Sequence, residues 1–95
     1  MITSLTETWL AVSVTRADIE NGDRGNITTC AVAKAVRRKL GIQDVKVYGK
    51  NVVVHAQGKK YATYLPKKVS TFISAFDAKK NVAPINFSIR FNRKW

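Results

Sequence analysis

The segment that follows Pro66 carries the pattern that most constrains the fold of this chain. Its apolar residues recur at steps of three and four, at Val69, Phe72, Ile73 and Phe76. That spacing predicts an amphipathic α-helix, and proline suits the first turn of such a helix. A helix with a single apolar face is stable only when a second layer of secondary structure covers that face. The rest of the chain is therefore expected to supply the second layer.

Alternating segments predict that this second layer is a β-sheet. Near its end, the chain alternates polar residues with the apolar residues Ile85, Phe87, Ile89 and Phe91. Residues 8–14 alternate in the same way, and residues 44–65 hold three short strand-like runs separated by the turns YGKN and AQGKK. These patterns are typical of half-buried antiparallel strands. The residues expected to point inward from the three short runs are Val45, Val47, Val52, Val54, Tyr61, Thr63 and Leu65.

A second helix is expected within residues 28–41, TTCAVAKAVRRKLG. Its apolar positions are Thr29, Val32, Ala33, Val36 and Leu40. They form one stripe, and Gly41 suits the end of a helix. Lys34, Arg37 and Arg38 share the opposite face, where we expect exposed side chains that contribute little to stability. Between the first strand and this helix, Thr15 and Asp18 have capping-box spacing, which predicts one short helical turn.

The predicted order of elements is β-α-β-β-β-α-β, in a single domain over residues 1–95. The economical packing places both helices on one face of a mainly antiparallel sheet, as an α+β two-layer sandwich. The other face of the sheet would then be open to solvent or to a partner. The expected shared core comprises Val12, Val36, Leu40, Val69, Phe72, Ile73, Phe76, Phe87 and Ile89.

Charge is the strongest compositional signal. The 95 residues carry 17 Lys and Arg against 6 Asp and Glu, a formal net charge of +11. The distribution is uneven, because residues 1–23 carry a net charge of −3 and residues 24–95 carry +14. Such a basic surface favours a polyanionic partner, either nucleic acid or an acidic protein surface. The alternative is that the charge serves only to keep a small protein soluble.

The sequence lacks the signals of membrane insertion and secretion. It has no apolar run long enough to span a bilayer, so no membrane partner is expected. Its start, MITSLTETWLAVSV, has no basic region and includes Glu7, unlike a secretory signal. The single cysteine excludes an internal disulfide, which fits a reducing compartment. We therefore expect the protein to act in the cytoplasm.

Catalytic and metal-binding patterns are missing from the sequence. Cys30 is the only cysteine and His55 the only histidine, whereas a zinc site needs about four ligands. Cys30 lies beside the apolar stripe of its helix and is expected to be buried. The spacing of Asp18, Glu20 and Asp23 does not follow a Ca²⁺-loop pattern, and there is no nucleotide-binding glycine loop. The sequence therefore predicts no enzyme activity, no metal and no cofactor.

Several short motifs, in their order and spacing, are similar to those of another group of proteins. They are VTRADIENG, a cysteine followed by AVAKAVRR, and FDAKKNVAPINFSI. The matching residues are Val14, Thr15, Asp18, Ile19, Gly22, Cys30, Val32, Ala33, Ala35, Phe76, Asp77, Val82, Pro84 and Phe87. Together they resemble a family of small proteins encoded by tailed phages and prophages. Ala31 departs from the family pattern, which usually has proline after the cysteine. The resemblance implies a phage gene product in the cytoplasm of a host cell, and it implies no particular activity.

Two surfaces are candidates for binding. The first is a cationic surface across the two helices, formed by Lys34, Arg37, Arg38, Lys39, Lys67, Lys68 and Lys79. The second is the open sheet face, which is expected to carry the aromatic and basic residues Trp9, Tyr48, Tyr64 and Arg90. Lys46, His55 and Lys60 are expected on or near that second face. Aromatic residues among cations are typical of single-strand nucleic-acid binding.

These observations favour a non-enzymatic phage-type protein that binds nucleic acid through a cationic surface. The alternative is a phage-encoded inhibitor that binds an acidic surface on a host protein. Such a target would belong to a defence system, as for anti-CRISPR proteins, or would process nucleic acid. The apolar component of the open sheet face also suits a homodimer.

Overall fold

The computed structural model describes residue 6 and residues 9–94. Its elements follow the predicted alternation of strands and helices, with a short helix where one helical turn was predicted and one short strand in addition. They are β1 (Leu10–Val14), α1 (Arg16–Asn21), α2 (Ala31–Leu40), β2 (Val45–Val47), β3 (Asn51–Ala56), β4 (Lys59–Tyr64), α3 (Lys67–Asp77), β5 (Ile85–Ile89) and β6 (Asn92–Lys94). No helix in the described ranges is both long enough and apolar enough to cross a membrane.

The strands form two antiparallel sheets, which confirms the α+β class. One sheet has the order β2-β3-β4-β6, and the other is a two-stranded ribbon of β1 and β5. The sequence analysis placed all strands in one sheet. Alternation fixes which side of each strand is apolar, but it does not fix which strands pair, because pairing is a non-local choice.

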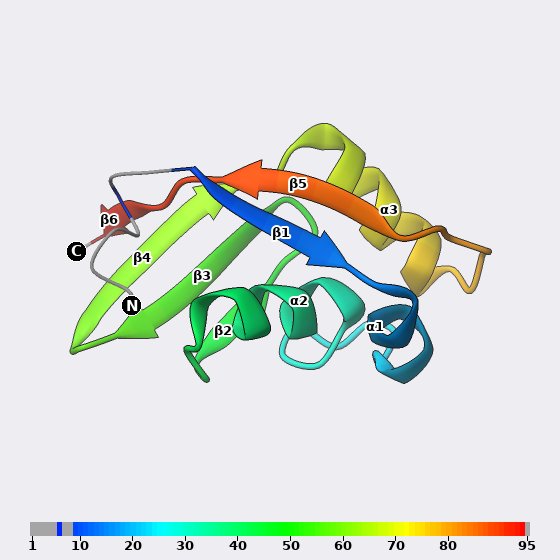
Figure 1. The fold of residues 1–95 in the computed structure, drawn as a ribbon, viewed down its shortest axis with the longest axis horizontal. Helices are drawn as coiled ribbons and strands as arrows, with labels where there is room; N and C mark the ends of the chain where they lie inside the picture. The colour runs from blue at the N-terminus through cyan, green and yellow to red at the C-terminus, as the bar shows by residue number, and fades with distance from the viewer. Residues whose placement is uncertain (1–5, 7–8, 95) are drawn as a thin grey trace.

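The ribbon and the two longer helices cover one face of the four-stranded sheet. Figure 1 shows β1 and β5 crossing in front of β3 and β4, with α2 on one side of the ribbon and α3 on the other. Burial alternates along the strands, so that Val52 and Val54 of β3 are buried while His55 is exposed. The opposite face of the sheet therefore has no layer of described secondary structure over it.

The core contains every residue that the sequence analysis assigned to it. Phe76, Val69, Val36 and Val12 are each at most 1 % exposed, and the other predicted core residues are also buried. The rings of Phe72 and Phe76 stack with their centroids 6.2 Å apart. The apolar stripe of α3 is therefore buried as its spacing predicted.

The start of α1 and the start of α2 are capped by side chains. In α1 the Thr15 hydroxyl accepts from the Asp18 N–H, and Asp18 Oδ2 accepts from the Thr15 N–H at 2.9 Å, which is the predicted capping box. In α2 the N-cap is Cys30, whose Sγ accepts from the Ala33 N–H at 3.5 Å. In the turn before α2, Asn26 accepts from the Thr28 and Thr29 N–H groups.

Gly22 is required where α1 packs against the start of α2. A Cβ atom at this position would lie 2.6 Å from the Ala31 nitrogen and 2.8 Å from the Asp18 carbonyl oxygen. Both are backbone atoms, so neither can move aside without shifting a helix. We expect Gly22→Ala to lower the free energy of unfolding by about 1–3 kcal/mol. Thermal unfolding measures the change, at roughly 4–8 °C per kcal/mol for a domain of this size.

Gly49 provides the matched control for that substitution. A Cβ at Gly49 would meet nothing within 4 Å. Gly49→Ala is therefore expected to change stability by no more than about 0.5 kcal/mol. Equal melting temperatures for the two variants would show that the close contact between α1 and α2 does not exist in solution.

Candidate nucleic-acid interface

Arg37 is not the free surface cation that the sequence analysis expected. Its side chain donates to three backbone carbonyls, those of Thr28, Gln43 (3.1 Å) and Val45 (3.4 Å). It is only partly exposed. The guanidinium thus ties the loop before α2 to the segment that enters β2. The expectation was wrong because unpaired carbonyls in irregular segments leave no sequence pattern.

Arg38 is likewise engaged within the fold. It makes a two-pronged ion pair with Asp18, with both N–O distances at 2.8 Å, and it also donates to the Ser13 carbonyl at 2.8 Å. The Asp18 side chain is buried, whereas that of Arg38 is about half exposed. The Arg38 guanidinium holds the pKa of the Asp18 carboxyl below its ordinary value. Arg37 and Arg38 were predicted to contribute little to stability, and these contacts contradict that prediction.

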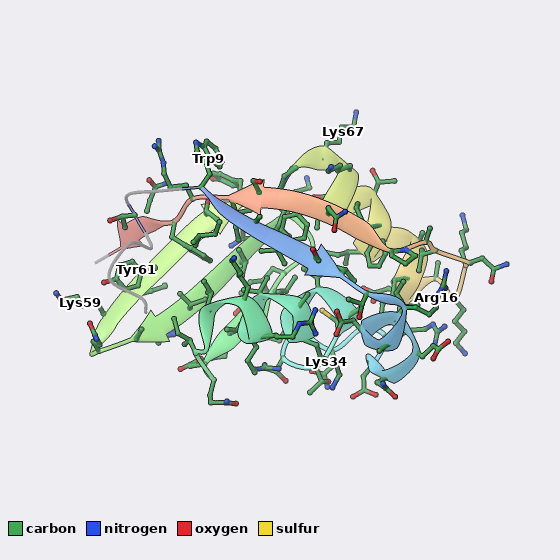
Figure 2. All side chains as sticks on the ribbon, viewed as in Figure 1. Trp9, Arg16, Lys34, Lys59, Tyr61 and Lys67 are labelled. Carbon is green, nitrogen blue, oxygen red and sulfur yellow. The ribbon has the colours of Figure 1, made fainter. Side chains whose placement is uncertain are left out.

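The predicted cationic surface across the helices is divided by the β1–β5 ribbon. Figure 2 shows Lys34 and Lys67 on opposite sides of the ribbon. Lys39 lines a hollow of about 350 Å³ on the α2 side of β1, and Lys68 lines one of about 390 Å³ on the α3 side. Lys79 lies two residues beyond the end of α3, whereas Lys67 is the first residue of that helix. The ribbon therefore lies between the cations of α2 and those of α3.

Trp9 and Arg90 also differ from their expected positions. Both flank the ribbon, directly before β1 and directly after β5, and neither belongs to the four-stranded sheet. The Arg90 guanidinium lies 5.3 Å from the centre of the Trp9 ring, and Trp9 is 66 % exposed. The open sheet face therefore keeps Tyr48 and Tyr64 but not this cation–π pair.

Tyr48 and Tyr64 lie in one row across the open sheet face. The Tyr48 N–H donates to the Asn51 carbonyl at the turn between β2 and β3, and Asn51 is the register partner of Tyr64 on β4. Neighbouring strands lie about 4.8 Å apart, so the two tyrosines are separated by roughly 10 Å. Tyr64 is 82 % exposed, the largest value among the exposed large apolar residues that the structure describes.

Tyr64 lines two hollows. One, of about 530 Å³, is lined by Lys50, Tyr64, Leu65, Lys67, Ser70, Thr71 and Ser74. The other, of about 210 Å³, is lined by Asn51, Ala62, Thr63, Tyr64 and Asn92. We define the Tyr64 surface as Tyr48, Lys50, Asn51, Tyr64, Lys67 and Asn92.

Sequence reasoning identified only part of this surface. It named Tyr48, Tyr64 and Lys67 but missed Lys50, Asn51 and Asn92. Lys50 lies in the YGKN turn, and a basic residue in a hairpin turn beside an alternating strand could have marked it. The two asparagines have no comparable signal in the sequence. Asn92 reaches this surface only because β6 pairs with β4, which is a long-range contact.

The remaining reactive side chains form no site in the described residues. Cys30 is buried, and burial raises the pKa of its thiol. His55 is exposed on the open sheet face, 3.6 Å from Asp44. No cluster of three potential metal ligands occurs in the part of the chain that the structure describes.

Comparison of the chain with protein-family models, curated proteins and solved structures found no match. The chemistry of the surfaces described above is therefore the basis for a functional proposal.

Proposed function

We propose that the protein is a non-enzymatic nucleic-acid-binding protein that contacts its ligand through the Tyr64 surface. The observation that carries the proposal is the position of an exposed tyrosine beside two lysines in one hollow. Lys50 and Lys67 both line the larger hollow next to Tyr64, together with three hydroxyl side chains. Lysine and hydroxyl groups are typical ligands of phosphate oxygens.

The strands of the open sheet face run through a segment that is rich in lysine and free of carboxylates. Residues 45–76 include six lysines and no carboxylate. Between described residues, Arg38 pairs with Asp18, and His55 Nδ1 lies 3.6 Å from Asp44 Oδ2. Lys46, Lys50, Lys60 and Lys67 thus have no described carboxylate as a partner. Lysines that contact phosphates release the counterions of the nucleic acid, which is the main source of non-specific affinity.

The described carboxylates are largely engaged elsewhere in the fold. Asp18 pairs with Arg38, Asp23 accepts from the Thr29 hydroxyl, and Asp77 accepts from the Gly25 N–H. These contacts lie around α1, the start of α2 and the end of α3. None of these three carboxylates lines either hollow at Tyr64.

Lys67 occupies a position that helix stability does not favour. It is the first residue of α3, where the helix dipole is positive. The following residue, Lys68, is also a cation. A lysine there costs a few tenths of a kcal/mol, whereas an acidic residue would stabilise the helix. Binding of an anion gives this placement a physical reason.

A protein partner is the second candidate, favoured by one observation. The exposed Trp9 ring stacks with Arg90 on the ribbon, away from the four-stranded sheet. Tryptophan and arginine are enriched among residues that dominate protein–protein binding energy. An inhibitor of a host protein with an acidic surface would use this pair together with Lys39 and Lys68.

The double variant Lys50→Gln/Lys67→Gln tests the nucleic-acid proposal, with Lys39→Gln/Lys79→Gln as the control of equal charge. Fluorescence anisotropy measures the affinity for a short labelled single strand, DNA and RNA, between about 50 and 200 mM salt. Losing two phosphate contacts should reduce the slope of log affinity against log salt by about 1.4. The control should keep the wild-type slope.

The outcomes separate the two candidates. Equal slopes for the two double variants would contradict a binding site at Tyr64. No binding of the wild-type protein to single strands or to a duplex would overturn the nucleic-acid proposal, and Trp9→Ala would then test the protein-partner alternative.

A further inference from the structure

We infer that the Tyr64 ring stacks on one unpaired base, and that the smaller hollow beside it receives and hydrogen-bonds that base. The inference rests on the proposed function and names its ligand class, which is single-stranded nucleic acid. It is carried by the difference in chemistry between the two hollows that Tyr64 lines.

The smaller hollow exists because β6 covers only part of β4. Asn92 is the first residue of β6 and lies opposite Ala62, so Thr63 and Tyr64 have no register partner on β6. The preceding residue, Phe91, is buried in the core, which draws the chain away from the sheet at that point. The space beside Tyr64 is therefore a consequence of where β6 begins.

The chemistry of the smaller hollow suits an uncharged planar group. Its lining includes Asn51, Asn92 and the small residue Ala62, but no charged residue. Carboxamides both donate and accept hydrogen bonds, as base edges do. Its volume of about 210 Å³ lies below the roughly 300–1,000 Å³ typical of drug-sized ligands, so the hollow suits a fragment such as one base.

The larger hollow suits the phosphate of the same strand. Lys50 and Lys67 supply positive charge, and Ser70, Thr71 and Ser74 supply hydroxyl donors. Because Tyr64 lines both hollows, a strand bound at this residue would place its base in the smaller hollow and a neighbouring phosphate in the larger one.

A duplex does not meet these requirements. Stacking on Tyr64 needs a base with an exposed face, whereas paired bases in a duplex are stacked on one another. Tyr48, roughly 10 Å away in the same row, offers a second ring for a neighbouring base of the strand.

Tyr64→Leu is the central variant, with Tyr64→Phe retaining the ring and Trp9→Leu serving as a control at another exposed aromatic residue. The probes are a labelled single strand, the same strand with abasic sugars, and the matching duplex. We expect Tyr64→Leu to weaken single-strand binding about 5–150-fold and to leave the salt slope unchanged. Tyr64→Phe and Trp9→Leu should bind within about twofold of wild type. Wild type should bind the abasic strand as weakly as Tyr64→Leu binds the intact strand.

Base recognition in the smaller hollow has its own readout. Asn51→Ala and Asn92→Ala should alter the relative affinities for homopolymeric strands of the four bases, again without changing the salt slope. Circular dichroism confirms that each variant is folded, which is expected because Tyr64 is largely exposed.

The possible failures are distinguishable. If wild type binds the single strand and Tyr64→Leu binds it equally tightly, the stacking inference is overturned and the electrostatic proposal stands. The same follows if wild type binds the intact and abasic strands with equal affinity. Tighter binding to the duplex than to the single strand would also overturn the inference. Failure of all three probes to bind wild type would remove the proposed function itself.

Discussion

Replacing Phe76 with alanine is expected to lower the free energy of unfolding by about 3–5 kcal/mol, the range for truncating a fully buried aromatic residue. Phe76 is 1 % exposed and stacks on Phe72, and the Arg24 guanidinium lies 5.2 Å from the centre of its ring. The substitution removes the contacts with Phe72 and Arg24 and leaves a cavity in the core. Because small domains are stable by only about 5–15 kcal/mol, this loss is a large share of the total.

Urea denaturation followed by circular dichroism measures the effect. Ile27→Ala is a suitable control, because Ile27 is 38 % exposed and its truncation is expected to cost no more than about 0.5 kcal/mol. A cooperative transition for Phe76→Ala at the wild-type midpoint would show that α3 is packed in a different register.

The second large effect is expected at Asp18, where one carboxylate joins α1, α2 and the end of β1. Asp18 accepts from the Thr15 N–H and from both prongs of Arg38, which in turn reaches the Ser13 carbonyl. Asp18→Ala removes the capping box and the ion pair together. We expect a loss of about 2–4 kcal/mol. Arg38→Gln is expected to cost less, about 1–3 kcal/mol, because the Arg38 side chain is half exposed and water can replace some of its hydrogen bonds to Asp18.

The same ion pair predicts a dependence of stability on pH. The Asp18 pKa is lowered in the folded protein, chiefly by the hydrogen bonds from Arg38. Its contribution is therefore fully present above the unfolded value of about 3.9, and it is lost as the pH falls through the lower folded value. Urea titrations of wild type and Asp18→Asn at a series of pH values measure the difference. That difference should shrink below about pH 4, and a constant difference would contradict a charged Asp18–Arg38 pair.

The parts of the fold that depend on local pattern could be predicted from the sequence. The stripe of α3, the capping box at Thr15 and the inward valines of β2 and β3 all follow from spacings within a few residues. The division into two sheets could not be predicted, since β1 and β5 pair across 70 or so residues of chain, a choice that alternation leaves open.

The candidate site was predicted only in part for the same reason. The outward positions of Tyr48 and Tyr64 follow from strand alternation, and both are exposed. Arg37 and Arg38 share a basic helix face in the sequence, but their partners come from elsewhere in the chain, with Asp18 twenty residues before Arg38. Local spacing identifies a cation on a helix face, whereas only the tertiary structure shows whether it is free to bind a ligand.

The most direct measurement of the central claim is an NMR titration of the ¹⁵N-labelled protein with a short single strand. Chemical-shift changes are expected at the Tyr64 surface, including Lys50, Asn51, Tyr64 and Asn92, and at the start of α3 around Lys67. Amides of α1 and α2 should change little. Changes confined to the helices or to the ribbon around Trp9, with none at Tyr64, would contradict the account.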